Sequence, residues 1–382
     1  MLLRTEATWS RGVLRSFAAA AHDHGWTLLH YHPDANVGWL VKEWAPAAVV
    51  VGPALSRQEL ATFAPVPLVS VAFDRSAAGV ASVCLDEAAI GSLALEHLLA
   101  TGLRRFSCFR LSDSPYIIER ERAFVAGARA AGAVVSNCWG SREDQRAESP
   151  AAILRWLRDL AKPCGIFTCT DRWGSLVARY ARVAGLRIPE DVALVGADND
   201  MLECELMVPP LSSVIIPWHG VGQAAAELVG LALAGTEIAG QRRVLAPIAV
   251  AGRRSSDVFA ADDPLVTKAL RWIRGNAGQR ITVDMVARAL GGGRQRLERR
   301  FRSVLQRTVH EEIRRAHVDV AKGLLETTDL GLAQIAAQSG FTNASLLSVA
   351  FRRELGCAPG VYRRRVQQEL GGSGEPRLVR AE

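Results

Sequence analysis

The last third of the chain contains one short pattern twice, and this repeat limits what that region can fold into. In the stretch 332–356, apolar residues recur at helical spacing on both sides of a Gly-Phe step. Gly340 stands where a tight turn needs a positive φ, and Asn343 can cap the helix that follows. Two short helices joined by a turn of this kind form a helix-turn-helix, whose second helix fits the major groove of DNA.

The same pattern is predicted upstream, over 282–305. Thr282 can cap a first helix, Gly291–Gly293 turn the chain, and a second helix covers 294–305 with its apolar residues facing inward. The stretch 310–326 is long enough to form the helix that joins the two units. We therefore predict an all-α domain with two helix-turn-helix units.

The positive charge of the chain is concentrated in this helical region. From Pro264 to the end there are 21 Lys and Arg against 11 Asp and Glu, a net charge of +10, whereas the preceding residues carry 25 against 28, a net charge of −3. A basic module attached to a slightly acidic body indicates a polyanionic partner. A basic surface that is merely solvated is the alternative that charge alone leaves open.

Before this region, short apolar runs alternate with helical patterns. The runs that are typical of buried strands are 47–53, 67–73, 105–111, 164–170 and 192–198. The stretches 87–102 and 119–132 have apolar residues at helical spacing and end at glycine. This alternation predicts an α/β body with parallel sheets, in which ligands bind beyond the carboxyl ends of the strands. Asp86, Asp171 and Asp198 stand at or near such ends, so they are the first candidates for a ligand site.

Composition divides the chain into four parts. Residues 1–254 form the α/β body, and the polar stretch 255–263 is interpreted as a linker. Residues 264–366 form the helical domain. The Gly-rich and charged segment 367–382 is expected to be disordered.

Other classes of protein receive little support from the sequence. No apolar run is long enough to span a membrane, and the first residues lack the pattern of a signal peptide, so a cytoplasmic protein is expected. The seven cysteines are scattered without a C-x-x-C pair, which favours reduced and mostly buried thiols.

The sequence also lacks the common catalytic motifs. There is no G-x-S-x-G, P-loop, H-E-x-x-H, or G-x-G-x-x-G after a strand, so we expect no enzyme and assign no catalytic residue, cofactor or metal ligand. His30 and His32 would share one strand face and suggest a metal site, but solvated or core histidines are the better interpretation.

The helical region resembles the AraC/XylS class of transcription regulators along residues 265–365. The segments that carry the resemblance are LERRF (297–301), RRAHVDVAKGLL (314–325), IAAQSGF (335–341), FRRELG (351–356), and Pro359 with Tyr362 and Arg363. Five segments in this order and spacing are far more specific than a single helix-turn-helix, and a helical bundle without a role in DNA binding is the alternative. The resemblance implies binding to a double-stranded DNA operator.

The resemblance also implies which side chains contact DNA. Base contacts are expected from the outward positions of each second helix, namely Arg294, Gln295, Glu298 and Arg299 in the first unit and Ala344, Ser345, Ser348 and Val349 in the second. Phosphate contacts are expected from Arg352, Arg353, Arg363, Arg364 and Arg365. Two positions depart from the family pattern, because Gly293 replaces a Ser cap and Val349 stands where Arg is frequent. The first unit therefore suits hydrogen bonds to guanine or cytosine, and the second suits apolar contact with thymine methyl groups.

The α/β body resembles the two-lobed sugar-sensing domain of LacI/GalR regulators and of periplasmic sugar-binding proteins. The stretches that carry this resemblance are LRIPEDVALVGADND (186–200), PPLSSVIIP (209–217) and EAAIGSLALEHLLATGLRRF (87–106). It implies that Asp198 bonds a sugar hydroxyl and that Arg120 and Asp171 belong to the same site. Ala123 replaces a family glycine near Arg120, and Trp9 stands in a slot that usually holds an aromatic residue able to stack on a sugar. A surface charge or a helix cap is the alternative interpretation of each charged residue.

A sugar sensor followed by an AraC-type domain is similar to the arrangement in XylR-like regulators. The resemblance covers nearly the whole chain and implies a homodimeric regulator of carbohydrate-use genes that responds to a sugar, expected to be a pentose such as xylose. Carboxylates and a guanidinium suit this task because they bond neighbouring hydroxyls in pairs. A sensor of a non-sugar metabolite is an alternative, and a transport-type binding protein is disfavoured by the missing signal peptide. The sequence does not name the sugar, the operator or the sign of regulation.

Overall fold

The computed structural model describes residues 1–3, 8–31, 37–52, 57–64, 66–72, 79–136, 138–140, 150–258, 263–305 and 307–370. His32, the linker positions 259–262 and residues 371–382 of the predicted tail lie outside these ranges. The prediction of disorder is wrong for the first four tail residues, 367–370, because they belong to the helix Pro359–Leu370. Contacts divide the chain into two compact units. The first contains Met1–Asp86, Ile216–Pro247 and the residues from Gln368, and the second contains Glu87–Ile215 and Ile248–Gln367. Among the described residues, no helix combines the length and the apolarity needed to cross a membrane.

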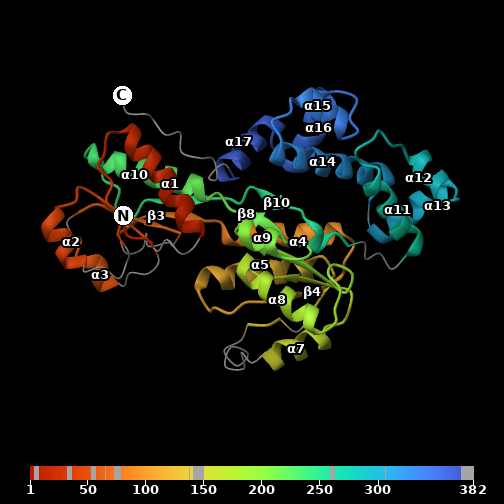
Figure 1. The fold of residues 1–382 in the computed structure, drawn as a ribbon, viewed down its shortest axis with the longest axis horizontal. Helices are drawn as coiled ribbons and strands as arrows, with labels where there is room; N and C mark the ends of the chain where they lie inside the picture. The colour runs from red at the N-terminus through yellow and green to blue at the C-terminus, as the bar shows by residue number, and fades with distance from the viewer. Residues whose placement is uncertain are drawn as a thin grey trace. The chain divides into compact units, whose positions relative to one another are not determined.

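The first unit is built around a parallel sheet with the strand order β1-β2-β3-β9. Its strands are β1 (Val49–Val51), β2 (Leu68–Val71), β3 (Ala81–Leu85) and β9 (Arg242–Leu245), and its helices are α1 (Thr8–Asp23), α2 (Val37–Trp44), α3 (Arg57–Ala61) and α10 (Trp218–Leu233). Every residue of β1 and β3 is buried, which explains why these strands are runs of apolar and small residues rather than alternating patterns. The long helices α1 and α10 pack against each other, and α10 also contacts β2 and β3 (Figure 1).

The second unit contains a sheet with the strand order β10-β8-β7-β6-β4-β5. Its strands are β4 (Arg105–Cys108), β5 (Val134–Val135), β6 (Cys164–Phe167), β7 (Val192–Ala197), β8 (Ser212–Ile215) and β10 (Ala249–Ala251). Neighbouring strands are parallel except β8 and β10. The helices of this part are α4 (Glu87–Ala100), α5 (Pro115–Ala130), α7 (Pro150–Asp159), α8 (Asp171–Val183) and α9 (Met201–Leu206). Each unit contains a sheet of parallel or mainly parallel strands, and helices alternate with these strands along the chain, which confirms the predicted α/β body (Figure 1).

The described residues from Pro264 to Leu370 form helices and the turns between them. They are α11 (Pro264–Gly275), α12 (Val283–Ala289), α13 (Arg294–Leu305), α14 (Val309–Thr327), α15 (Leu332–Gln338), α16 (Ala344–Leu355) and α17 (Pro359–Leu370). The pairs α12–α13 and α15–α16 are the two predicted helix-turn-helix units, with α14 between them. Both predicted caps form, since Thr282 Oγ1 accepts a hydrogen bond from Met285 N at 3.3 Å and Asn343 Oδ1 accepts one from Leu346 N at 2.9 Å.

Gly340 makes the tight turn between α15 and α16 possible. Its φ is +75°, in the left-handed region that glycine adopts without strain. A Cβ atom at this position would lie 2.6 Å from the carbonyl oxygen of Gln279 and 2.6 Å from Nε2 of His317. Glycine is therefore required both by the backbone angle and by the close packing of this turn against the rest of the domain.

Candidate effector site and DNA-binding surface

Charged side chains gather beyond the carboxyl ends of β6 and β7 in the second unit. Asp171 is the first residue of α8, which follows β6, and Asp198 directly follows β7. Arg120 comes from α5 and lies 3.7 Å from Asp198. The sheet edge that brings these three predicted residues together is the one at which ligands bind in parallel α/β sheets.

Arg120 is a buried cation with defined partners. Only 1% of its surface is exposed, so the alternative interpretation as a surface charge is wrong. Its Nε donates a hydrogen bond to Glu87 Oε2 at 2.6 Å, and its Nη1 donates to the carbonyl oxygen of Cys169 at 2.9 Å. Burial alone would lower the pKa of Arg120, but the carboxylates of Glu87 and Asp198 raise it above its usual value. The guanidinium is therefore a fixed positive charge.

Asp198 is the member of this group that remains accessible to a ligand. Its side chain is 25% exposed, against 2% for the side chain of Arg120. Burial raises the pKa of Asp198 to about 7, while Arg120 acts in the opposite direction. The φ angles of +111° at Asp198 and +51° at Asn199 are unusual for residues other than glycine. Such conformations persist where the surrounding structure holds them, and they cluster at binding sites.

Asp171 lies deeper and supports the turn that carries Asp198. It is 1% exposed, and its Oδ2 accepts a hydrogen bond from Asp200 N at 2.7 Å. Gly196 makes room for this carboxylate, because a Cβ atom there would lie 2.1 Å from Asp171 Oδ1. Burial raises the pKa of Asp171, and the charge of Asp198 raises it further. These contacts indicate that Asp171 positions the turn after β7. A direct contact between Asp171 and a ligand stays a prediction.

Trp9, the fourth predicted ligand residue, belongs to the first unit. It lies on α1, where its ring packs against the ring of Trp218 with centroids 5.5 Å apart. Stacking of Trp9 on a sugar stays a prediction. His30 also has a local partner, since its Nε2 lies 3.1 Å from the carbonyl oxygen of Leu3.

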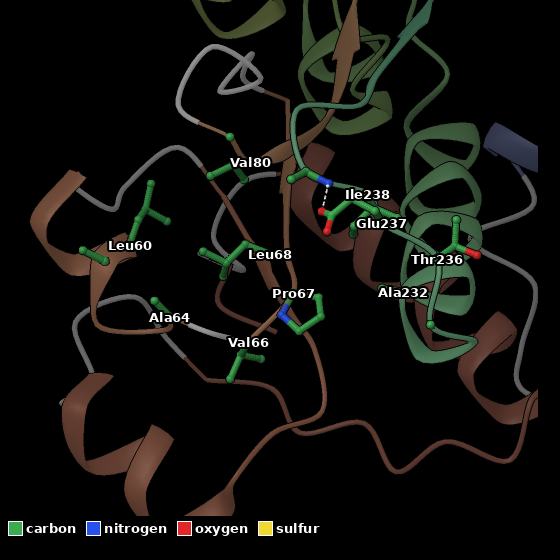
Figure 2. Close-up of a pocket in the computed structure, with 14 residues that line it drawn as sticks. Leu60, Ala64, Val66, Pro67, Leu68, Val80, Ala232, Thr236, Glu237 and Ile238 are labelled. Carbon is green, nitrogen blue, oxygen red and sulfur yellow. Dashed lines mark hydrogen bonds between the residues drawn. The ribbon is translucent and has the colours of Figure 1, made fainter.

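A large pocket of the first unit lies at the amino ends of its strands. It has a volume of about 730 Å³ and is lined by residues that precede β2, β3 and β9, together with the ends of α3 and α10 (Figure 2). Its labelled walls are mainly apolar, and Glu237 accepts a hydrogen bond from the backbone N–H of Ala239 at 2.9 Å. Because ligands of parallel α/β sheets bind at the carboxyl ends of the strands, we do not assign this pocket as the effector site.

The second helix of the first helix-turn-helix unit, α13, exposes most of its predicted base-reading side chains. Gln295 and Arg299 are exposed, and Glu298 is half-buried. Arg294 is also exposed, and its guanidinium pairs with Asp284 at 3.2 Å. An exposed pair of this kind contributes little to stability, so Arg294 can exchange Asp284 for an acceptor on DNA.

Four of the five predicted phosphate-binding arginines are exposed. They are Arg352 and Arg353 on α16, and Arg364 and Arg365 on α17. Arg363 differs, because it is half-buried and its guanidinium donates a hydrogen bond to the carbonyl oxygen of Leu330 at 2.6 Å. Arg363 therefore ties α17 to the segment before α15 and is the least available of the five for a phosphate.

Comparison with known proteins identifies the family. A family model for a periplasmic binding protein-like domain matches residues 95–256, and one for a helix-turn-helix domain matches residues 286–365. The xylose operon regulatory protein of Escherichia coli (strain K12) is 30% identical over 288 residues, which cover 74% of this chain and 73% of that protein. The xylose operon regulatory protein of Haemophilus influenzae is 29% identical over 286 residues, which cover 74% of each chain. The chain belongs to the XylR-like regulators.

Solved structures agree with membership of the XylR-like regulators. The structure of the xylose-binding transcription activator xylR is 25% identical, with a TM-score of 0.56, and the match covers 95% of this chain and 97% of that chain. A complex of the transcriptional regulator CelR with cellobiose, 23% identical with a TM-score of 0.54 over 65% of this chain and 79% of that chain, supports the fold alone. The chain is a DNA-binding transcription regulator with an α/β sensor domain and a helical DNA-binding domain.

In this XylR-like chain, the exposed surface of α16 is more apolar than the four predicted base-reading residues alone imply. Val349 is 62% exposed and Ser345 is exposed, while Ala344 and Ser348 are half-buried. Leu346, which was not among the predicted residues, is 51% exposed. Its spacing of three residues from Val349 places both side chains on one face of the helix, and this signal was present in the sequence. An exposed Leu and Val on a recognition helix suit the predicted contact with thymine methyl groups.

Proposed function

We propose that this XylR-like chain controls carbohydrate-use genes by coupling the binding of a sugar, a pentose such as xylose, to the binding of operator DNA. The observation that carries the proposal is the group formed by Glu87, Arg120 and Asp198 beyond the end of β7. A partly exposed carboxylate beside a fixed guanidinium suits the neighbouring hydroxyls of a sugar, which both donate and accept hydrogen bonds. The names of the relatives support xylose, because two are xylose operon regulatory proteins and the matching structure is described as xylose-binding.

In this proposal the signal leaves the effector site through the start of the linker. Arg253 precedes the linker and donates from Nη2 to Asn199 Oδ1 at 2.8 Å, next to Asp198. Two residues later, Ser255 Oγ donates to the carbonyl oxygen of Leu194 in β7 at 2.7 Å. The backbone that leads to the DNA-binding domain is thus bonded to β7 and to the turn after it. A ligand that shifts Asp198 and Asn199 therefore acts on the first residues of the linker.

On the DNA side, α13 and α16 are the proposed recognition helices. The base contacts would come from the exposed faces of these two helices, and the phosphate contacts from the exposed arginines of α16 and α17. Two such helices in one chain suit adjacent major-groove segments about one helical turn apart. We propose that the regulator acts in the cytoplasm as a homodimer on its operator.

A thermal-shift screen of pentoses and hexoses tests this proposal, because a ligand held only by the native state raises the Tm. We expect a pentose to raise the Tm and to change the affinity for duplexes that the protein selects from random DNA. A screen in which only non-sugar metabolites raise the Tm would replace the sugar by another effector. A sugar that binds without changing the DNA affinity would contradict the proposed coupling.

A further inference from the structure

Two cysteines and a glutamate of the second unit bring their ligand atoms to one place. Cys108 ends β4, Glu121 lies on α5, and Cys138 comes shortly after β5. The two sulfur atoms and a carboxylate oxygen all lie within 4.8 Å of one another. Neither the proposed sugar contacts nor the DNA-binding surface uses these three side chains.

The backbone holds the two thiols side by side. Phe109 and Trp139 are partners in a parallel bridge, and Trp139 N donates to the carbonyl oxygen of Cys108 at 2.8 Å. Cys108 and Cys138 each precede a bridge partner by one residue, so their side chains point to the same face of the sheet. Cys108 is buried, whereas Cys138 and Glu121 are half-buried, so a small cation can reach the cluster from the side of these two residues.

The chemistry of this ligand set fits a soft divalent cation. Thiolates together with one carboxylate suit Zn²⁺, which binds sulfur at about 2.3 Å and oxygen at about 2.1 Å. The ligand atoms of a tetrahedral site of that size are roughly 3.5–3.8 Å apart. The observed atoms lie within 4.8 Å of one another, so a bound cation would have to draw them closer by at most about 1 Å. Three protein ligands leave a fourth position for water.

Arg110 offsets part of the negative charge of such a site. Its Nε donates to Glu121 Oε2 at 2.5 Å, which leaves the second carboxylate oxygen to bind a cation. Arg110 also contacts Asp113 and so is held in place. Two thiolates, the Glu121 carboxylate and a divalent cation sum to a single negative charge, which Asp113 increases to two, and the guanidinium of Arg110 offsets one of them. Partners that hydrogen-bond a ligating carboxylate are typical of metal sites in proteins.

We propose that Cys108, Cys138 and Glu121 form a binding site for a divalent cation of the Zn²⁺ type. The bound cation joins β4, α5 and the segment after β5. Because Glu121 follows Arg120 on α5, the cation also fixes the helix that carries Arg120. The site is thus a stabilising device of the sensor domain, distinct from the sugar contacts.

Metal titration of the full-length, tag-free, reduced and metal-stripped protein tests the site. We expect one equivalent of Co²⁺ to bind with a thiolate charge-transfer absorption, and Zn²⁺ to displace it and to raise the Tm. C138S and E121Q should each weaken Co²⁺ binding by about tenfold or more. Cys357→Ser, which removes a half-buried cysteine of the DNA-binding domain, is the matched control and should bind Co²⁺ like the parent protein.

Circular dichroism checks that each variant folds, and E121Q keeps both thiols, so the test survives if C138S does not fold. A reduced protein without the charge-transfer absorption would overturn the proposal. So would unchanged Co²⁺ binding in folded E121Q, or a Cys108–Cys138 disulfide that persists in excess reduced glutathione.

Discussion

At the residue scale, the ionisation of Asp198 decides what the candidate effector site can bind. Burial raises its pKa to about 7, Arg120 lowers it, and Glu87 raises it again. Because an unfolded chain has an Asp pKa of about 4, the folded chain holds this proton more tightly. The contribution of Asp198 to stability is therefore complete below about pH 4 and is lost as the pH rises to about 7. A sugar hydroxyl that donates a hydrogen bond to the carboxylate lowers the pKa of Asp198, because it favours the ionised form.

We therefore expect the sugar affinity to increase as the pH rises from about 6 to 8 and Asp198 ionises. Asp198→Asn should lose this pH dependence and the sugar response, while sugar-free DNA binding stays nearly intact. Calorimetric titration with the best sugar at several pH values, followed by operator titration with and without it, measures both effects. A folded variant that still responds fully to the sugar would show that Asp198 is not the ligand contact.

Local sequence patterns pointed to some residues of this candidate site and not to others. Asp171 and Asp198 were predicted as ligand residues partly because each follows an apolar strand run, and a position after a strand is a local signal. Glu87 was missed as a partner of Arg120, which lies 33 residues away along the chain. The contact between Arg253 and Asn199 spans 54 residues. Such partners depend on which strands and helices become neighbours, and no local pattern carries that information.

At the scale of elements, the helices α13 and α14 of the DNA-binding domain were predicted to within one residue at each end, whereas α5, predicted over 119–132, covers Pro115–Ala130. The structure has α13 over 294–305 as expected, and α14 over Val309–Thr327 where 310–326 was predicted. Caps and turn glycines mark helix ends locally, which explains this agreement. Strands were less predictable, because β9 is an exposed edge strand with two arginines and β5 has only two residues. Neither contains the apolar run that identified β6 and β7.

The turn of the second helix-turn-helix unit gives a test at this scale. Gly340→Ala should destabilise the DNA-binding domain by more than the ~1–2 kcal/mol that a left-handed alanine costs, because its Cβ atom would also meet the backbone of Gln279. Gly356→Ala is the matched control, since Gly356 has a φ of +71° and a Cβ atom added there would meet no other atom within 4 Å. Urea unfolding of the two full-length variants measures the difference. Equal losses would show that the backbone angle alone requires glycine at position 340.

The proposed recognition helix α13 and the helix α17 are expected to contribute to DNA binding in different ways. Arg299→Ala on α13 should relax specificity at one base pair and cost roughly 1–3 kcal/mol on the operator. Arg364→Ala on α17 should weaken binding to all sequences about equally and reduce the salt dependence. Affinities for operator and random duplexes at several salt concentrations separate the two effects. If both variants behave alike on both duplexes, the division into base-reading and phosphate-binding helices is wrong.

At the scale of the whole molecule, regulation requires that the binding of the effector and the binding of DNA are energetically coupled. If a sugar changes the operator affinity by some factor, operator DNA must change the sugar affinity by the same factor. Factors of about 5–150-fold are typical of allosteric proteins. In the proposed mechanism, the coupling would pass through the linker or, in the proposed homodimer, through a contact between subunits. The hydrogen bond from Arg253 to Asn199 makes the linker route accessible to experiment.

Arg253→Gln should reduce this factor towards one while sugar binding and sugar-free operator binding persist. The shorter side chain loses the guanidinium that bonds Asn199 Oδ1 at 2.8 Å and the carbonyl oxygen of Leu211 at 2.9 Å, so the turn after β7 no longer holds the start of the linker. Arg254→Gln removes the same charge from the neighbouring exposed position and serves as the control. Operator titrations with and without saturating sugar give the factor for each variant. If Arg253→Gln and Arg254→Gln retain the same factor as the parent protein, the signal does not pass through Arg253, and a contact between subunits becomes the route to test.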